Sequence, residues 1–492
     1  MRTSNPPITP DFPPPNTTIS TPMSEQRQDV DPAAVSAALN LPSKPPSPTP
    51  DAEDASPPRK RPRTRAPPQA DIPAPKPTVH EPIAPAPKQY VQPPTSPSQH
   101  ETHRFPIQPL HRFHGASATI KRPREVAHFS YDDNHEYRDD ESSINYYVPP
   151  PLGADLKEGF DTFRHHEDKE DQHLDSLLQA LMEKEQKEGS DKRVKADFVT
   201  WRGMMTKILT APFDHFAEFN MFATLHDSTI YIEEDFPSRF AARAAESSHP
   251  PPRSHHPDPQ SQSREMMTYW GYKFETLSLI PTPPSSTTPE QIRVHQRAVT
   301  SNHAQHCSIV STSFGPHSLL LGGEVDGLLA PKPANPDEQV QWVELKTTEE
   351  LPPPQRQQHR DILKFERKLL KFWAQSFLLG VPKVVVGFRS KTGILRGLQT
   401  FNTHEIPGMV RRGTGCWDGN VCINFAAGFL GWLKEVVQGE GVYSVVLRRK
   451  SGVVEVTRVG DGTGNIVSEE FLAWRRAGDE GDEGEDGGGA RS

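Results

Sequence analysis

The sequence predicts a fold of mixed α+β class, and three features of the chain support this prediction. Strand signals at residues 318–329 and 340–347 are followed by a helical stretch at 365–379, where large apolar residues recur at helical intervals. Residues 443–447 and 453–457 predict a closing β-hairpin. The alternation of strands and helices is compatible with α+β and α/β arrangements. We take it as α+β, with mixed β-sheets and flanking helices.

The other elements follow from the same periodicities. Residues 104–165 predict short strands and turns, and residues 384–388 predict a short buried strand. Residues 425–437 predict another helix. A charged helix is expected over 168–188, where the apolar residues at helical spacing are Leu174, Leu177, Leu178, Leu181 and Met182.

Composition divides the chain into an arm, one domain and a tail. Of the 53 prolines, 27 lie in the first 100 residues, beside few large apolar side chains. Such a segment cannot bury enough surface to offset its ordering entropy, so residues 1–103 are expected to be a disordered arm. Residues 104–476 can form one large core, with flexible insertions at 244–265 and 281–289. The acidic residues 477–492 are expected to be a disordered tail.

The charge balance argues against a simple duplex-binding protein. The formal net charge is −9, with +1 in residues 1–100 (10 Lys/Arg, 9 Asp/Glu) and −5 in residues 477–492, which leaves −5 for the remainder. Proteins that bind duplex nucleic acid without sequence preference normally carry a basic stripe. An enzyme that holds phosphates through divalent cations on its own carboxylates is not excluded.

Cysteine content and hydropathy bear on the cellular environment. Cys307, Cys416 and Cys422 form no metal-ligand spacing and no disulfide framework, so we expect a reducing compartment. No apolar run approaches the length of a membrane span, and no membrane association is expected. The basic cluster at residues 59–65 fits either a nuclear import signal or an ordinary solvated charge run.

Two short motifs carry the candidate chemistry. Glu324-Val325-Asp326 ends one apolar run, and Glu344-Leu345-Lys346 follows another. Residues i and i+2 of a β-strand share a face, so Glu324 and Asp326 are expected to project together, as are Glu344 and Lys346. If the two strands pair as a hairpin, three carboxylates and one ammonium converge on a single patch.

Such a patch would be suited to a divalent cation. Like charges raise one another's pKa, and a bound cation relieves that repulsion. Hard oxygen ligands favour one or two Mg²⁺ or Mn²⁺ ions, which would polarise phosphoryl oxygens and activate water, while Lys346 stabilises developing negative charge. The alternative is that these are ordinary strand ends with exposed charges.

The E-x-D…E-x-K pattern resembles the catalytic core of the PD-(D/E)xK nuclease-like fold. The chain further resembles the Rai/DXO family of RNA decapping nucleases, particularly its fungal nuclear branch, over about residues 104–476. The stretches that carry this resemblance, besides the two motifs, are Phe105-Pro106-Ile107-Gln108-Pro109, Lys121-Arg122-Pro123-Arg124-Glu125 through Phe129-Ser130-Tyr131-Asp132, Trp201-Arg202-Gly203, Gly271-Tyr272-Lys273-Phe274-Glu275 and Trp373 through Pro382.

The resemblance implies roles for individual residues. It implies metal coordination by Glu275, Glu324, Asp326, Glu344 and the main-chain carbonyl of Leu345. It implies catalysis by Glu324, Asp326, Glu344 and Lys346. The residues that it places against the substrate are Trp201, Arg202, Gly203, Cys307, Glu324, Lys346 and Gln375. For Cys307, a buried structural thiol is an equally good interpretation.

The resemblance also implies a function. It implies hydrolysis at abnormal RNA 5′ ends: release of pyrophosphate from 5′-triphosphate RNA and removal of incompletely methylated caps and NAD caps. It further implies partnership with a Rat/Xrn-type 5′→3′ exoribonuclease in the nucleus, in RNA quality control and rRNA processing. The alternatives are a non-catalytic partner of that exoribonuclease and a DNA nuclease of the same broad fold.

Overall fold

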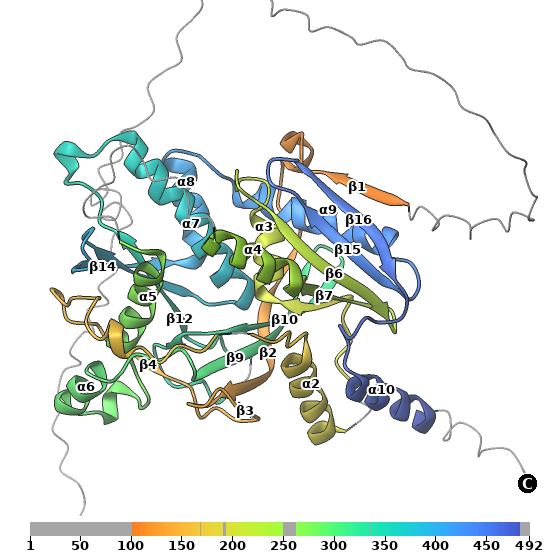
Figure 1. The fold of residues 1–492 in the computed structure, drawn as a ribbon, viewed down its shortest axis with the longest axis horizontal. Helices are drawn as coiled ribbons and strands as arrows, with labels where there is room; N and C mark the ends of the chain where they lie inside the picture. The colour runs from red at the N-terminus through yellow and green to blue at the C-terminus, as the bar shows by residue number, and fades with distance from the viewer. Residues whose placement is uncertain (1–100, 168, 190–192, 249–261, 336, 483–492) are drawn as a thin grey trace, which may run out of the picture. The chain divides into compact units, whose positions relative to one another are not determined.

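The computed structural model describes residues 101–167, 169–189, 193–248, 262–335 and 337–482. Nearly all of the predicted Pro-rich arm, the basic cluster at 59–65 and the end of the acidic tail lie outside these residues, and the predictions for them stay predictions. The described chain forms two β-sheets with helices packed around them (Figure 1). The predicted α+β class with mixed sheets and flanking helices is confirmed.

The larger sheet has ten strands, in the order β1-β16-β15-β6-β7-β5-β10-β9-β2-β3. Strand β10 lies near its middle, antiparallel to β9 and parallel to β5, so the sheet is mixed. The strands are β1 (Thr102–Pro106), β2 (Ile120–Tyr131), β3 (Tyr137–Arg138), β5 (Phe198–Trp201), β6 (Phe219–His226), β7 (Thr229–Glu234), β9 (Gln305–Phe314), β10 (His317–Glu324), β15 (Val442–Leu447) and β16 (Val453–Gly460).

The smaller sheet has six strands, in the order β14-β13-β12-β11-β4-β8. Strand β12 is parallel to β13 and antiparallel to the two-residue strand β11. The strands are β4 (Tyr146–Tyr147), β8 (Leu279–Ile280), β11 (Gly327–Leu328), β12 (Trp342–Glu349), β13 (Lys383–Arg389) and β14 (Leu395–Asn402).

Nine α-helices are described alongside the two sheets. They are α2 (Asp175–Glu188), α3 (Arg202–Thr210), α4 (Phe236–Ser248), α5 (Arg264–Ser278), α6 (Pro289–Gln296), α7 (His359–Leu379), α8 (Ile406–Arg412), α9 (Gly419–Val436) and α10 (Glu469–Asp482). Short 3₁₀ turns complete the secondary structure at Leu110–Phe113, Phe160–Thr162, Pro284–Ser286, Pro354–Arg356 and Thr403–Glu405.

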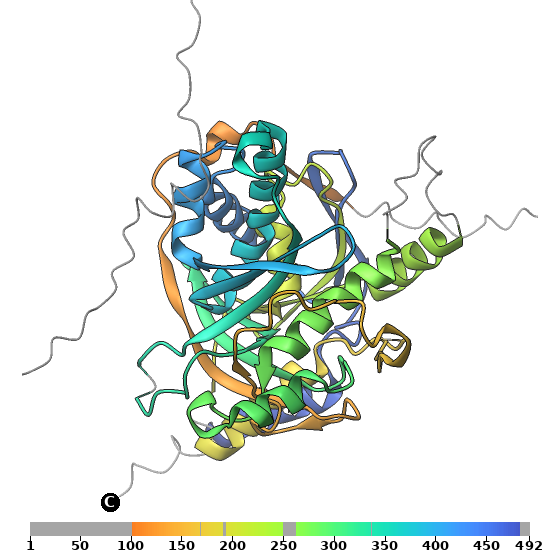
Figure 2. The ribbon, with the colours of Figure 1, turned by 90° about the vertical axis from the view of Figure 1, so that its left-hand side faces the viewer.

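Helices α5 and α7 pack against different residues of the smaller sheet. Apolar side chains of α7 share one core with β10 of the larger sheet and with Val384 and Val386 of β13. Trp270 and Phe274 of α5 pack instead against Val343, Leu345 and Val385. Successive strand residues face opposite sides, so these alternating partners place α7 and α5 on opposite faces of the smaller sheet. Helices α5 and α6 lie on the side that faces the viewer in Figure 2.

Long elements agree with the sequence predictions, and the boundaries of several others differ. Helix α7 ends where the sequence predicts, because Gly380 adopts a left-handed conformation with φ 71°. The predicted strand at 384–388, the helix at 425–437 and the closing hairpin correspond to β13, α9 and β15–β16.

Four predicted boundaries are wrong. Helix α2 begins at Asp175 rather than at 168, because His173 has a positive φ of 45° that no helix accommodates. Strand β1 begins at Thr102, inside the predicted arm, and α10 continues into the predicted tail as far as Asp482. The insertion predicted at 244–265 is narrower, since α4 reaches Ser248 and α5 begins at Arg264. Its middle, residues 249–261, lies outside the described chain.

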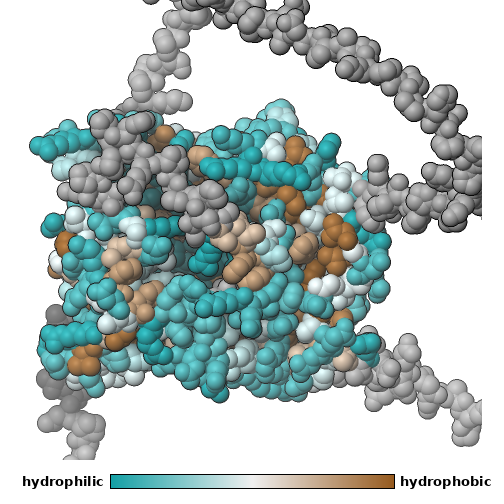
Figure 3. All heavy atoms as spheres, in the orientation of Figure 1, coloured by the Kyte–Doolittle hydropathy of each residue, from teal (hydrophilic) through white to brown (hydrophobic). Residues whose placement is uncertain are grey.

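The face of the molecule in Figure 3 is largely hydrophilic, with apolar residues in separate patches. Among the described residues, no helix is both long enough and apolar enough to cross a membrane.

Candidate active site

The acidic residues of the two motifs come from two different sheets. Glu324 is the last residue of β10 in the larger sheet, whereas Glu344 lies on β12 in the smaller one. The two motif strands do not pair as a hairpin: β10 pairs with β5 and β9, and β12 pairs with β11 and β13. The chain turns between the sheets immediately after Glu324, so the two motifs meet where the sheets meet.

Asp326 reaches the site from this turn and not from a strand face. It lies between β10 and β11, which corrects the prediction that it shares a strand with Glu324. Strand β11 pairs with β12 only as far as Val343, and beyond that point Asp326 Oδ2 accepts a hydrogen bond of 2.6 Å from the Leu345 amide. The N–H and C=O groups of one strand residue point to the same side. The Leu345 carbonyl is therefore directed to the strand edge where Asp326 lies.

Glu344 is fully buried, and two cations neutralise it. Its Oε2 accepts a hydrogen bond of 3.2 Å from Arg202 Nη1, and Lys346 Nζ lies 2.6 Å from its Oε1. Burial opposes the charge of Glu344, but Lys346 and Arg202 outweigh it and hold the pKa of Glu344 below its ordinary value. Glu344 is thus an ionised, fixed carboxylate.

The other three carboxylates lack comparable partners. Burial, together with the charge of Glu344, raises the pKa of Asp326 to about 7. Burial also raises the pKa of Glu324, and for Glu275 on α5 burial and the charges of Asp326 and Glu324 raise the pKa well above its usual range. Glu275, Glu324 and Asp326 are half-buried acids that repel one another, and together they form a set of hard oxygen donors without enough positive charge. This donor set fits a divalent cation such as Mg²⁺ or Mn²⁺.

These three acids line an open cleft of about 440 Å³. The cleft is bounded by α5, by the segment after α6 and by the end of β10, so its acidic wall faces solvent. Other residues that line it are Tyr272, Thr276, His295, Gln305, His306 and Asn145. A phosphate chain entering the cleft would meet the carboxylates and any cation that they hold.

Two glycines allow the Trp201-Arg202 segment to approach Glu324. Strand β5 ends at Trp201 beside Gly322, and α3 begins at Arg202. A Cβ atom on Gly322 would lie 2.8 Å from the Trp201 ring, and one on Gly323 would lie 2.9 Å from the Arg202 Cβ. No larger residue fits there without a shift of the neighbours. The glycines before the first motif therefore bring Arg202 within reach of Glu344.

The remaining predicted site residues are Gly203, Gln375 and Cys307. Gly203 is exposed in the first turn of α3, and Gln375 is half-buried on α7. Cys307 lies opposite Glu324 in the β9–β10 pair and is buried. Burial raises the pKa of its thiol, so Cys307 is a neutral thiol beside the site, which is compatible with both a structural and a substrate-lining role.

Some residues that support the site were missed from the sequence. The Trp201 indole donates a hydrogen bond of 3.2 Å to the His173 carbonyl, and His173 Nδ1 lies 3.0 Å from the buried Glu233 carboxylate. His306 lines the cleft with its Nε2 buried and without a partner among the described residues. These residues lie far apart in sequence and share no motif, so no local signal could have identified them.

Groups of metal-binding side chains also occur elsewhere. In the described part of the chain, three ligand atoms lie within 4.8 Å of one another in Glu125–His128–Glu141 and in Asp171–His173–Glu233. The four carboxylates of the candidate site, which are Glu275, Glu324, Asp326 and Glu344, are not among these tight groups. Their grouping is therefore looser, and close coordination would draw them together around an ion.

The sequence matches a known protein family and a decapping nuclease. Residues 121–472 match a family model described as "RAI1 like PD-(D/E)XK nuclease". Over 373 residues the chain is 47% identical to a decapping nuclease RAI1 of Emericella nidulans, an alignment that covers 75% of this chain and 98% of the relative.

Solved structures of the same kind share the fold. A Candida albicans Rai1 in complex with pU5 and Mn²⁺ matches with a TM-score of 0.67 and 26% identity, over 77% of this chain and all of that one. A Scheffersomyces stipitis Rai1 in complex with (3′-NADP)⁺ and calcium ion matches with a TM-score of 0.64 and 26% identity, over 74% of this chain and 98% of that one.

Proposed function

Because the chain belongs to the RAI1-like PD-(D/E)XK nuclease family, we propose that it is a divalent-metal-dependent hydrolase of abnormal RNA 5′ ends. The observation that carries this proposal is the cleft wall of Glu275, Glu324 and Asp326, three half-buried carboxylates with raised pKa values beside the buried, neutralised Glu344. The family match and the identity to the Emericella relative confirm the family and the nuclease-like fold predicted from the sequence. They also confirm the prediction of a hydrolytic enzyme that processes RNA.

The relatives support RNA 5′ ends as the substrate. The Emericella relative is a decapping nuclease at 47% identity, and the Candida neighbour binds a short uridine oligonucleotide together with Mn²⁺. The Scheffersomyces neighbour binds a 3′-phosphorylated nicotinamide dinucleotide, which is compatible with the NAD caps named from the sequence. We extend these ligands to this chain as part of the proposal, with Mg²⁺ or Mn²⁺ as the cation.

The residues present define the chemistry that the site would perform. A divalent cation held by Glu275, Glu324, Asp326, Glu344 and the Leu345 carbonyl would polarise a phosphoryl oxygen and make an attacking water more acidic. Lys346 remains charged, because Glu344 and Asp326 outweigh its burial and raise the pKa of Lys346. Its ammonium can therefore stabilise the charge that develops on the phosphorus oxygens.

Arg202 is the second cation directed at the substrate. Its guanidinium donates one N–H to Glu344, and its other N–H groups can make the forked contacts that suit a phosphate. The pair with Glu344 also fixes its orientation before the substrate arrives. Arg202 would therefore bind and orient the 5′ phosphates. Its neighbours Trp201 and Gly203 lie at the start of α3 and would also contact the substrate.

The finer parts of the proposal concern substrate range and cellular role. We include pyrophosphate release from 5′-triphosphate RNA, removal of incompletely methylated caps and removal of NAD caps. We also include association with a Rat/Xrn-type 5′→3′ exoribonuclease in the nucleus, which would degrade the 5′-monophosphate product in RNA quality control and rRNA processing.

An assay on the full chain tests the enzyme directly. Purified protein and the Glu324→Gln variant are incubated with triphosphate, unmethylated GpppN-capped and NAD-capped RNA, in Mn²⁺ or in EDTA, with 5′-phosphorylated single-stranded DNA in parallel. We expect Mn²⁺-dependent release of the 5′ groups from RNA by the wild type and none by the variant. Absence of any metal-dependent product would overturn the proposal, and cleavage of DNA alone would favour a DNA nuclease.

A binding assay tests the partnership separately. Tagged wild type and the inactive Glu324→Gln variant are mixed with the purified exoribonuclease, and complex formation is measured by size-exclusion chromatography. We expect both to bind, because the variant changes only the cleft. A stable complex combined with no hydrolysis would identify a non-catalytic partner.

A further inference from the structure

The proposed metal site depends on the spacing of two sheets. Glu324 belongs to the larger sheet and Glu344 to the smaller one, and the connection between them runs from Asp326 through β11 and residues 329–341. A cation needs ligand oxygens at defined distances from one another. Whatever fixes the connecting segment against the larger sheet therefore also sets the separation of the ligands.

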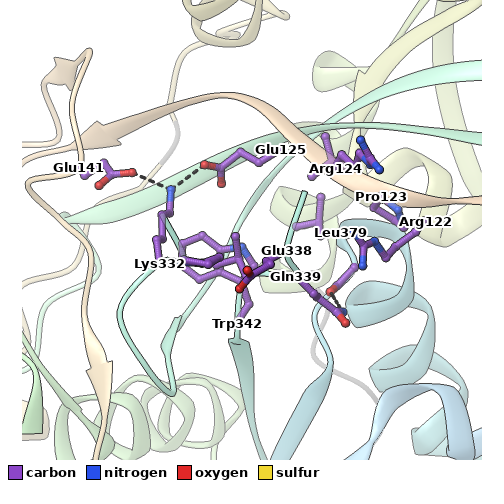
Figure 4. Close-up of a pocket in the computed structure, with 14 residues that line it drawn as sticks. Arg122, Pro123, Arg124, Glu125, Glu141, Lys332, Glu338, Gln339, Trp342 and Leu379 are labelled. Carbon is purple, nitrogen blue, oxygen red and sulfur yellow. Dashed lines mark hydrogen bonds and ion pairs between the residues drawn. The ribbon is translucent and has the colours of Figure 1, made fainter. Parts of the chain in front are cut away.

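Lys332, within this segment, makes three contacts with its surroundings. Its Nζ lies 2.6 Å from Glu125 Oε1 and 2.7 Å from Glu141 Oε1, and 5.1 Å from the centre of the Trp342 ring (Figure 4). The side chain is largely shielded, with 20% of it exposed. A shielded ion pair resists screening by salt better than an exposed one does. The ammonium thus joins the connecting segment to β2 and to the loop after β3.

The far end of the Glu125 link leads to Glu324. Glu125 lies on β2 and accepts a hydrogen bond of 2.7 Å from Ser308 Oγ on β9. Ser308 follows Cys307, the residue that is paired with Glu324 across β9 and β10. Glu125 is therefore anchored to β9, next to the residue of β9 that pairs with Glu324 of β10.

The near end of the link leads to Glu344. Trp342, against which the Lys332 ammonium lies, is buried and precedes Glu344 by two residues on β12. Residues i and i+2 of a strand share a face, so the indole and the Glu344 carboxylate project from the same side of β12. Holding Trp342 in place consequently constrains the strand at the point where Glu344 emerges.

We propose that Lys332 is a positioning residue for the metal site, whose ammonium links the Glu324 half on the larger sheet to the Glu344 half on the smaller sheet through Glu125, Glu141 and Trp342. The inference rests on the proposed metal site. Lys332 touches neither the substrate nor the cation and acts through the spacing of their ligands.

The same contacts make Glu125–His128–Glu141 a poor metal site despite its close ligand atoms. The ammonium of Lys332 is within 2.7 Å of both carboxylates, where a cation would have to bind. His128 Nδ1 is 3.4 Å from the same Glu125 oxygen. The cluster is thus already supplied with positive charge, and its role is to hold Lys332.

Mn²⁺ binding to the full chain, measured by isothermal titration calorimetry, tests the inference without using activity. The variants are Lys332→Met, which keeps a chain of similar length without charge, and Lys332→Arg, which keeps the charge. We expect Lys332→Met to bind Mn²⁺ about 10- to 100-fold more weakly, the range usual when a residue that orients metal ligands is lost. Lys332→Arg should recover most of that affinity.

Two controls separate the possible failures. Lys371 on α7 forms a 3.0 Å ion pair with Asp214, a link that involves neither motif. The Lys371→Met variant removes this pair and should bind Mn²⁺ like the wild type. Glu344→Gln should abolish binding, and if it does not, the proposed metal site itself is wrong. If Glu344→Gln does not bind Mn²⁺ but Lys332→Met binds it with wild-type affinity, the inference about Lys332 is wrong and the proposed metal site is unaffected.

A further variant covers the case in which Lys332→Met does not fold. Glu141 is half exposed, so Glu141→Gln removes one of the two ion pairs at little risk to folding. We expect it to weaken Mn²⁺ binding about threefold, in proportion to the partial loss of the link. Wild-type affinity in Glu141→Gln would then contradict the role of Lys332.

Discussion

This molecule contains two groups of carboxylates, and they differ in how far neighbouring cations of the protein compensate their negative charge. In one, burial opposes the charge of Glu125, yet His128 and Lys332 hold the pKa of Glu125 at about 2. In the other, burial and the charge of Glu344 raise the pKa of Asp326 to about 7. The first group is neutralised by the protein itself, whereas the second carries negative charge that the protein leaves uncompensated.

The comparison shows that close spacing alone does not identify a cation site. Among the described residues, Glu125, His128 and Glu141 satisfy the distance criterion for a metal group, and the cleft carboxylates are spread more widely. A buried charge costs free energy unless it is paired. The group with unpaired charge is therefore the one where a cation would be stabilising, and the paired group serves to hold the structure.

The largest expected effect comes from removing an uncompensated charge. Asp326→Asn should lower the hydrolysis rate roughly 1,000-fold, since losing the cation removes several kcal/mol of transition-state stabilisation. The metal-free variant should nevertheless melt at a higher temperature than the metal-free wild type, because one of the mutually repelling half-buried acids is gone. Activity assays and thermal unfolding in EDTA measure both effects.

A matched control for that variant is Asp461→Asn, which removes an exposed carboxylate paired with Arg458. It should leave both rate and melting temperature close to the wild type, as exposed ion pairs contribute at most about 1 kcal/mol. A lower melting temperature for metal-free Asp326→Asn would show that the cleft charges are not in conflict.

The next largest effect should come from removing a compensating cation. Arg202→Ala leaves the buried Glu344 with Lys346 alone, and should cost on the order of 2 to 3 kcal/mol of stability, with about a 100-fold loss of rate. The sign of the stability change is thus opposite to that expected for Asp326→Asn. Arg202→Lys should restore more stability than rate, because an ammonium lacks the forked geometry. A gain of stability in Arg202→Ala would contradict the assigned role of this cation.

The smallest effect on activity is expected for His173 and Glu233, which do not line the cleft and compensate each other's charge only in part. Burial raises the pKa of Glu233 from 4.5 to about 7, although His173 opposes this; burial in turn opposes the charge of His173, but Glu233 raises the pKa of His173. A folded pKa above the unfolded one means that the stability contribution of Glu233 is full below pH 4.5 and is lost as the pH rises to about 7.

Glu233→Gln removes that pH dependence. The stability of the wild type relative to the variant should therefore decline between pH 4.5 and pH 7.5 by about 3 kcal/mol, since the pKa is raised by about 2.5 units at about 1.4 kcal/mol for each unit. Thermal unfolding of both proteins at several pH values gives the difference. His173, whose pKa Glu233 raises, contributes a decline in the same direction, and the titrating groups away from this pair cancel. A difference that is constant with pH would mean that Glu233 is ionised in the folded protein across this range.

The sequence by itself determined much of this protein. Local periodicity was enough for α7, with its Gly380 terminus, and for the β15–β16 hairpin, because both depend on neighbours within a few residues. The two acidic motifs and the stretches around them were enough to predict the family. These features are read from residues that are close in the chain.

Only the tertiary structure decided how the motifs meet. The sequence was compatible with a hairpin, but Glu324 and Glu344 lie on separate sheets, and Asp326 accepts a hydrogen bond from the Leu345 amide on β12. The contacts of Lys332 with Glu125 and Glu141 span about 200 residues of sequence (207 and 191). Residue spacing along a strand fixes only which side chains share its face. The choice of strand partners, and of the charges that lie opposite one another, depends on the packing of distant segments, and no local pattern records it.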